Sequence, residues 1–298
     1  MSSLLNRRDF LRTGALVTAM QTIPAVAMPV RPAKLRLTSQ DFKRRLSGPI
    51  VSLPTPFLAD GQIDSTGLRR MIARAQQHGI DIFELTAGDS QYSSLSYEET
   101  KELARIVVES TGEGGMTIIG TNSWWTERTI DFARYAESIG ATALQVLKPT
   151  GAEEDGVVEH YRRVAQSTRL PIVLHGDFSF ALLSRLVEID SIVALKEDVS
   201  LSYYVDGIIR FGKRLNCFSG GGLDWFLVGQ PYGSTAYFDS YATFAPEITV
   251  RFRDAVKRGD TAAEVEIIEH YDHPFIQFFS APFWHATLEY FGVARRYL

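Results

Sequence analysis

The chain has 298 residues, of which 45% are hydrophobic and 22% charged, and its formal net charge is −4. This size suits one large α/β domain as well as two small domains, and an acidic balance without a basic stripe disfavours nucleic acid as a partner. The single cysteine excludes an intramolecular disulfide and a cysteine-based metal site, and the six scattered histidines form no HExxH pair, so we predict no metal site and no cofactor.

The first 27 residues have the layout of an export signal. Arg7 and Arg8 lie in a basic region, and the following stretch from Gly14 to Ala27 is mildly apolar and ends in Ala-x-Ala. Paired arginines followed by Asp-Phe-Leu-Arg are typical of a twin-arginine signal; the alternative is a basic tail leading into an amphipathic helix. We expect residues 1–27 to be cleaved and the mature protein to be periplasmic or secreted. The apolar stretch is too short for a stable membrane span.

Residues 28–45 are predicted to form a linker and an N-terminal helix. From there on, short apolar runs alternate with amphipathic helical stretches. Each run is rich in β-branched or bulky side chains, as in a strand buried on both faces. The eight runs are 49–53, 80–85, 116–119, 143–147, 171–174, 191–195, 215–218 and 234–237.

Helix signals separate these runs. Ser96 and Glu99 predict a capping box, and Asp64 or Ser65 can cap a helix that ends before Gly79. These signals place an amphipathic helix after each of the first two strands.

Eight strand–helix units, at spacings of roughly 20–35 residues, predict a (β/α)₈ TIM barrel, an α/β fold, over residues 46–258. No G-x-G-x-x-G follows the first strand, which disfavours a doubly wound dinucleotide-binding sheet. Residues 259–298 are expected to add helices outside the barrel, among them 260–279 and 283–291.

Lys196 is the most informative candidate for chemistry. Barrel enzymes carry their active sites at the C-terminal ends of the strands, and Lys196 directly follows the apolar run 192–195. Burial there favours the uncharged amine, which can attack a carbonyl carbon. The alternative is a lysine at the rim, paired with Glu197 or Asp198.

Four short motifs occur in a specific order and spacing, and they end with Leu-Lys-Glu around Lys196. Together they resemble the dihydrodipicolinate synthase / N-acetylneuraminate lyase family from about Leu46 to the C-terminus. The resemblance implies a class I aldolase-type barrel with extra C-terminal helices, usually tetrameric, in which a strand-six lysine forms a Schiff base with pyruvate or another 2-keto acid. The motifs span residues 55–64, 86–90, 95–99 and 195–197.

By this resemblance, Lys196 is the Schiff-base lysine. Thr86 matches a loop hydroxyl that helps to hold the keto acid and relay protons. In the same loop Ala87 replaces a second hydroxyl that normally helps to bind the carboxylate, Gly88 is retained, and Asp89 stands where the family has glutamate.

The chain departs from the family pattern at three places. The strand-four tyrosine that shuttles protons is absent, because Pro149-Thr-Gly151 stands there. A stretch beginning with His175 replaces the Tyr-Asn-x-Pro that commonly follows strand five, and Phe180 stands near the place of an arginine that binds the second substrate. Dihydrodipicolinate synthesis itself is therefore not expected.

Three side chains could replace the missing tyrosine. His175 titrates in a suitable range, Tyr92 lies in the loop after the second strand, and Glu84 shares a strand face with Thr86. Glu84 could oppose attack by holding the lysine protonated, or act as a base once the imine has formed. The alternatives are a histidine bound to backbone, an aromatic loop anchor and an ion pair between Glu84 and Lys148.

The glycine-rich turn after the seventh predicted strand offers backbone N–H groups at Ser219, Gly220 and Gly221. Such donors can bind a substrate carboxylate, which would compensate for the hydroxyl lost at Ala87. The alternative is a turn that binds no ligand.

The sequence thus predicts an enzyme, a Schiff-base-forming aldolase or dehydratase, that acts on pyruvate or a sugar-derived 2-keto acid. The alternative is a catalytically impaired barrel that serves as a periplasmic keto-acid or sugar-acid binding protein. A metal-dependent hydrolase lacks ligands at the strand ends. By resemblance, the protein is expected to be a homodimer or homotetramer.

Overall fold

The computed structural model describes residues 36–278. The predicted export signal, most of the linker and the predicted helix at 283–291 lie outside the described residues. Eight parallel strands pair in sequence order and close into a barrel, which confirms the predicted (β/α)₈ fold. The strands are β1 Gly48–Ser52, β2 Ile82–Leu85, β3 Met116–Gly120, β4 Ala143–Leu147, β5 Ile172–His175, β6 Ile192–Glu197, β7 Asn216–Ser219 and β8 Ala236–Asp239.

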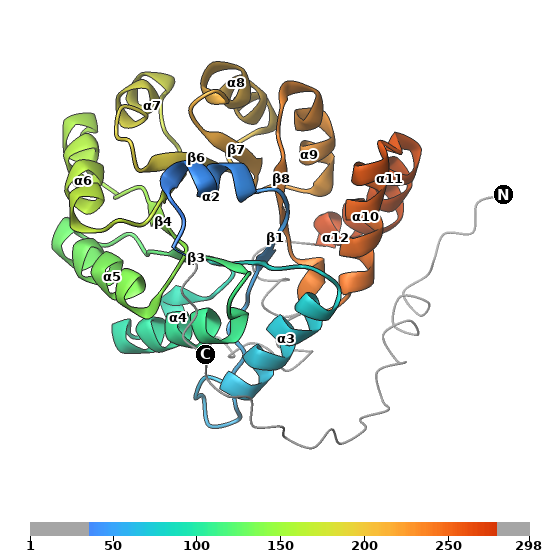
Figure 1. Cartoon of the computed structure of the whole chain (residues 1–298), viewed down its shortest axis with the longest axis horizontal. Helices are drawn as coiled ribbons and strands as arrows, with labels where there is room; N and C mark the ends of the chain where they lie inside the picture. The colour runs from blue at the N-terminus through green and yellow to red at the C-terminus, as the bar shows by residue number, and fades with distance from the viewer. Residues whose placement is uncertain (1–35, 279–298) are drawn as a thin grey trace. The chain divides into compact units, whose positions relative to one another are not determined.

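Helices surround the strands as an outer ring (Figure 1). Those of the ring are α3 Ser65–Gln77, α4 Tyr97–Thr111, α5 Thr126–Ile139, α6 Glu154–Ser167, α7 Phe180–Leu186, α8 Leu201–Phe211, α9 Leu223–Gly229 and α10 Pro246–Arg258. The helix α2 (Ser39–Arg45) precedes the barrel, whereas α11 (Thr261–Ile267), a π-helical turn (Ile268–Asp272) and α12 (His273–Phe278) follow it.

The predicted helix caps are confirmed. Ser96 and Glu99 form a reciprocal capping box at the start of α4, and the Asp64 side chain accepts a hydrogen bond from the Gly67 N–H at 2.8 Å. Gly79, which follows the C-cap residue His78 of α3, has φ +68°, a left-handed conformation that ends the helix without steric cost.

Of the strands whose C-terminal ends differ from the predicted ranges, β5, β6 and β8 carry residues of the candidate site. β8 runs from Ala236 to Asp239, two residues later than predicted, because it pairs with β1 along that length. β5 and β6 extend to His175 and Glu197, since the ladder between them continues past the apolar runs. Lys196 is therefore inside a strand, where its backbone is fixed.

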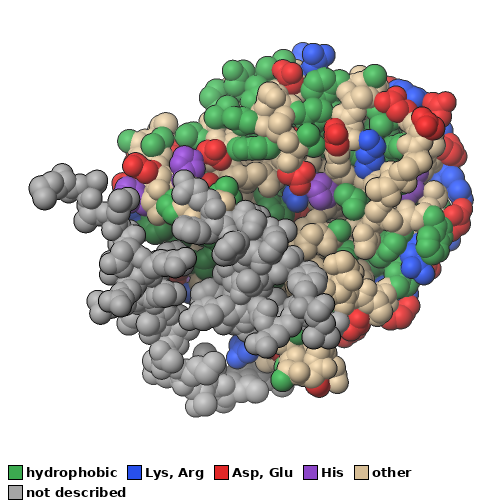
Figure 2. Space-filling view, turned by 180° about the vertical axis from the view of Figure 1, so that it is seen from behind, with side chains coloured by type: hydrophobic (Ala, Val, Ile, Leu, Met, Phe, Trp, Pro, Cys, Tyr) green, Lys and Arg blue, Asp and Glu red, His purple; other side chains and the backbone are tan. Residues whose placement is uncertain are grey.

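The barrel interior is filled by a cluster with at least one buried residue from every strand, together with Phe42 and Leu46 beside α2. α2 therefore covers the N-terminal end of the barrel, the end that faces the viewer in Figure 1. Figure 2 shows the opposite face, where acidic, basic and histidine side chains occur together. Functional side chains are expected at that end.

Because side chains alternate along a strand, four polar residues also face the barrel interior, on the C-terminal side of the apolar cluster. Each lies two positions after a residue of that cluster, so it faces the same way. They are Glu84 after Ile82, Gln145 after Ala143, His175 after Val173 and Lys196 after Ala194.

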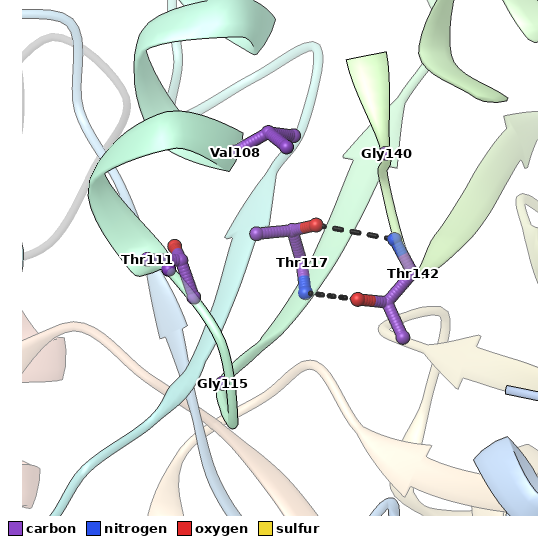
Figure 3. Close-up of a pocket in the computed structure, with 7 residues that line it drawn as sticks. Val108, Thr111, Gly115, Thr117, Gly140 and Thr142 are labelled. Atoms are coloured by element: carbon purple, nitrogen blue, oxygen red, sulfur yellow. Dashed lines mark hydrogen bonds between the residues drawn. The ribbon is translucent and has the colours of Figure 1, made fainter. Parts of the chain in front are cut away.

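A cavity between α4 and the start of β3 has a volume of about 10 Å³, room for about one water molecule (Figure 3). Beside it, Thr117 and Thr142 exchange hydrogen bonds between backbone N–H and side-chain hydroxyl at 3.1 and 3.2 Å (Figure 3). These contacts join the N-terminal ends of β3 and β4, so the cavity lies at the end of the barrel opposite to that of an active site. It is also too small for a substrate.

Over residues 36–278, no helix combines the length and the apolar character needed to cross a bilayer. Nor does this part of the chain bring three or more His, Cys, Asp or Glu side chains together in a way that could hold a metal ion. Cys217 is a free, buried thiol on β7.

Candidate active site

Lys196 lies in the barrel interior near the C-terminal end of β6, with 5% of its side chain exposed. Its Nζ is 4.0 Å from the centre of the Phe238 ring on β8 and 3.7 Å from Oδ2 of Asp198. The second distance is too long for a direct hydrogen bond. The lysine is therefore buried rather than at the exposed rim, although it is paired with Asp198 as the alternative drawn from the sequence proposed.

Asp198 also contacts His175. The Nε2 atom of His175 is 3.0 Å from the same Asp198 oxygen that faces Lys196. Burial by itself raises the pKa of Asp198, but the hydrogen bond from His175 and the charge of Lys196 outweigh it and lower the pKa to about 2. Burial lowers the pKa of His175, and the neighbouring Lys196 charge lowers it further, against the effect of Asp198. At neutral pH the site therefore holds a carboxylate at Asp198 and a neutral imidazole.

Glu84 is fully buried in the interior on β2, as strand alternation predicts. Its Oε1 accepts a hydrogen bond from the Gln145 side chain on β4, whereas the Lys148 side chain donates instead to the Asp177 carbonyl. The alternative of a Glu84–Lys148 ion pair is therefore wrong. Burial raises the pKa of Glu84 to about 8, although the Lys196 charge opposes this shift. Its carboxyl is therefore mostly protonated at pH 7.

Thr86 follows β2 and is held by a loop tied to β1. Its N–H donates to Ser90 Oγ at 3.1 Å, and the Ser90 hydroxyl donates to the Leu53 carbonyl at 2.7 Å. Thr55 Oγ1 donates to the Ser90 carbonyl at 2.6 Å. Ala87 and Gly88 continue this loop, whose contacts hold the backbone at Thr86.

Four buried polar atoms around this region have no hydrogen-bond partner among the described residues. Tyr92 is buried, and Glu84 raises its pKa beyond the effect of burial, so the two side chains lie near each other. Unsatisfied buried groups are costly, so such a set indicates a place for ligand or water. The four atoms are Glu84 Oε2, Thr86 Oγ1, Tyr92 OH and His175 Nδ1.

The glycine turn after β7 is packed tightly. The Gly220 N–H already donates to the Glu197 carbonyl at 2.6 Å, and a Cβ on Gly220 would lie 3.1 Å from Lys196 Cε. A Cβ on Gly221 would lie 2.5 Å from the Trp225 ring, and Ser219 is fully buried. Close packing against Lys196 and Trp225 thus explains these glycines, and their binding of a substrate carboxylate stays a prediction.

The start of α9 is capped from the C-terminal extension. The Leu223 N–H donates to Asp272 Oδ2 at 2.9 Å, and the Tyr241 hydroxyl donates to Asp272 Oδ1 at 3.0 Å. Asp272 thus takes the place that an anion would occupy at this helix end and ties the extension to the loops after β7 and β8.

The positions where the family pattern is broken have structural explanations. Gly151, at the place of the strand-four tyrosine, has φ +73°, a conformation that strains any residue with a side chain. Phe180, near the place of the arginine, stacks on Tyr203 at 4.8 Å between ring centres, with the Arg210 guanidinium 4.7 Å from its ring. Both sites are built for residues other than those of the synthase.

Sequence reasoning missed three residues of the site as participants. Asp198 is expected from the sequence only as an ion-pair partner of Lys196. Its position two residues after Lys196 nevertheless indicates that both side chains lie on the same side of the strand. Gln145 is a polar residue within a run otherwise apolar, which is a usable signal. No sequence signal indicates Phe238, because the predicted range of β8 ends at Tyr237.

Comparison with known proteins places the chain among lyase-like barrels. The Dihydrodipicolinate synthetase family profile matches residues 45–293. A 4-hydroxy-tetrahydrodipicolinate synthase from Methanothrix thermoacetophila is 31% identical over 234 residues, 75% of this chain and 78% of the relative. A Streptomyces coelicolor protein named "Probable 5-dehydro-4-deoxyglucarate dehydratase 1" is 28% identical over 262 residues, 81% of each chain.

Among solved structures, a prophage protein of the dihydrodipicolinic acid synthase family from Escherichia coli, in complex with pyruvate, superposes with a TM-score of 0.72 at 24% identity. The match covers 82% of this chain and 87% of that one. The profile match spans most of the chain, and the barrel and the strand-six lysine agree with it. The chain therefore belongs to the dihydrodipicolinate synthetase family.

Proposed function

We propose that this protein is a Schiff-base-forming lyase, an aldolase or dehydratase, in which Lys196 attacks a sugar-derived 2-keto acid. The observation that carries the proposal is the Lys196 side chain, which is 5% exposed and lies near the C-terminal end of β6 with Asp198 Oδ2 3.7 Å from its Nζ. Attack on the carbonyl carbon is made by the lone pair of this amine.

The polar lining supports a hydroxylated substrate rather than pyruvate alone. Glu84, Thr86, Tyr92 and His175 each have a buried polar atom without a partner among the described residues. A substrate with several hydroxyl groups can satisfy such atoms, whereas a methyl group cannot. The dehydratase name of the Streptomyces relative agrees with a sugar acid.

The chemistry follows from the amine. Lys196 Nζ attacks C2 of the keto acid and water leaves, which gives an imine between nitrogen and C2. When protonated, the imine draws electrons from the neighbouring carbon. A proton or a carbon–carbon bond is then lost at that position, and a hydroxide leaves if the reaction is a dehydration. Aldolase and dehydratase share the imine stage, so one experiment tests both.

We expect borohydride to trap this imine. The mature protein is incubated with sugar-derived 2-keto acids or pyruvate, borohydride is added, and peptide mass mapping locates the adduct. The imine is reduced to a stable secondary amine on Lys196, with more trapping at equal concentration from a sugar acid than from pyruvate. Lys148 is the internal control because it is half-buried but lies at the end of β4 with its Nζ bonded to a carbonyl. Absence of an adduct with every keto acid favours the binding-protein alternative.

We also propose that the protein is exported through the twin-arginine route and acts in the periplasm or outside the cell. Replacing Arg7 and Arg8 together by lysine is expected to leave the protein uncleaved in the cytoplasm, because this route reads paired arginines. Cell fractionation and the N-terminal mass measure the effect, and the wild-type product should begin at Met28. The same replacement at Arg31 and Arg36 serves as control, and export of both variants would contradict the proposal.

By family resemblance, we further propose a homodimer or homotetramer. Large apolar side chains on the surface support a subunit contact, among them Trp125 and Ile209, each 61% exposed. Trp125 carries the Arg128 guanidinium 4.4 Å from its ring, and aromatic residues and arginine are both enriched in protein interfaces.

A further inference from the structure

Asp198 connects the two ionisable side chains that β5 and β6 present to the interior. His175 and Lys196 are partners in the register of these neighbouring strands, so their side chains lie side by side. A single oxygen, Asp198 Oδ2, is 3.0 Å from His175 Nε2 and 3.7 Å from Lys196 Nζ. The three side chains form a compact group at the C-terminal end of the barrel.

The hydrogen bond to Asp198 decides which histidine nitrogen carries the proton. An ionised carboxylate can only accept, so His175 Nε2 must donate its hydrogen to it. In a neutral imidazole the other nitrogen, Nδ1, then has a free lone pair. Nδ1 is buried and has no partner within the described part of the chain. The lone pair of His175 Nδ1 is therefore available to accept a proton from a bound ligand.

Resting on the proposed function, we infer that His175 Nδ1 is the base that replaces the missing tyrosine, and that Asp198 is the positioning residue that sets its tautomer. After Lys196 has formed the protonated imine, Nδ1 takes a proton from C3 of the keto acid. The electron pair of the C3–H bond becomes the C2=C3 double bond, and the imine π pair moves to nitrogen. The products are a neutral enamine and an imidazolium stabilised by the Asp198 carboxylate, and the reverse step returns the proton.

The other two candidates suit this role less well. Tyr92 would have to ionise, and burial together with Glu84 raises its pKa. Glu84, with a pKa raised by burial to about 8, is mostly an acid at pH 7. The charged groups that affect His175 are Lys196, Asp198 and Asp89, and its neighbour on β4 is the apolar Leu147.

Exchange of the C3 hydrogens of pyruvate with D₂O isolates the proton step from turnover. Wild type, His175→Gln, Asp198→Asn and Asp198→Glu are compared by NMR, and each is also tested for borohydride trapping with pyruvate. An asparagine side chain can donate to Nε2 and so reverses the tautomer. We expect His175→Gln and Asp198→Asn to lower the exchange rate about 10²–10⁴-fold and still give the Lys196 adduct. Asp198→Glu should restore part of the rate.

A merely structural role would not alter the pH dependence of exchange. The wild-type rate should rise with pH as the imidazole loses its proton, and His175→Gln should lack this rise. Asp177→Asn, an exposed carboxylate two residues after His175, should behave as wild type. Exchange at the wild-type rate in both His175→Gln and Asp198→Asn, with normal trapping, overturns this inference alone. Failure of the wild type to trap any of the keto acids and to exchange the C3 hydrogens of pyruvate overturns the proposed function and this inference with it.

Discussion

Replacing Lys196 by methionine is expected to lower the turnover number at least about 10⁴-fold and to abolish the borohydride adduct. Without the amine no imine can form, and no other lysine among the described residues has its Nζ near Asp198. Methionine has a similar length and is apolar, so it fits beside Phe238 and should leave the melting temperature near that of the wild type. Steady-state kinetics on the keto acid that traps best, together with calorimetry, measures both effects.

The matched control is Lys148→Met. Lys148 also follows directly on a barrel strand, but its amine donates to the Asp177 carbonyl rather than facing the barrel interior. We expect it to keep turnover within a few-fold of wild type and to form the Lys196 adduct. Residual turnover in Lys196→Met close to that of the control would contradict a Schiff-base mechanism, whatever the melting temperatures show.

Replacing Glu84 by glutamine is expected to stabilise the protein at neutral and alkaline pH. The unfolded chain releases the Glu84 proton near its ordinary pKa of 4.5, whereas the folded protein holds it up to about pH 8 because the carboxyl is buried. Between these values the unfolded state binds fewer protons, so the free energy of unfolding falls as pH rises. The fall is about 1.4 kcal/mol for each pH unit, or roughly 3 kcal/mol at pH 7.

Glutamine cannot ionise and can still accept from Gln145, so it removes this fall while it keeps the contact. Chemical denaturation at several pH values should show curves for Glu84→Gln and wild type that meet near pH 4.5 and diverge up to about pH 8. Glu197, whose pKa burial raises to about 8, should leave part of the fall in the variant. Glu188→Gln, at an exposed position, is the control, and parallel curves for Glu84→Gln and wild type would contradict a buried neutral Glu84.

Much of the site followed from local sequence. Lys196 could be found because a lysine directly after a buried apolar run must lie at the C-terminal end of a barrel strand, where active sites lie. Glu84 and Thr86 could be placed on one face because strand alternation depends only on their spacing. The capping box at Ser96 and Glu99 was predictable for the same reason, since both residues belong to one helical turn.

What the sequence could not provide was contact between distant strands. Asp198 meets His175 across 23 positions, and Phe238 meets Lys196 across a longer separation that includes the whole of β7. These contacts depend on barrel closure and register, which are set by pairing between strands rather than by any short segment. The alternative that paired Glu84 with Lys148 is wrong for the same reason, because the inward face of β4 presents Gln145 to Glu84.

The sequence by itself therefore determined the (β/α)₈ architecture, the order of the elements and the candidate nucleophile, because hydrophobic periodicity and residue spacing are local properties. Only the tertiary structure decided which charges Lys196 faces, which nitrogen of His175 carries the proton and whether Glu84 is ionised. Those properties depend on burial and on distances between atoms far apart in the chain, and both arise only once the barrel has closed.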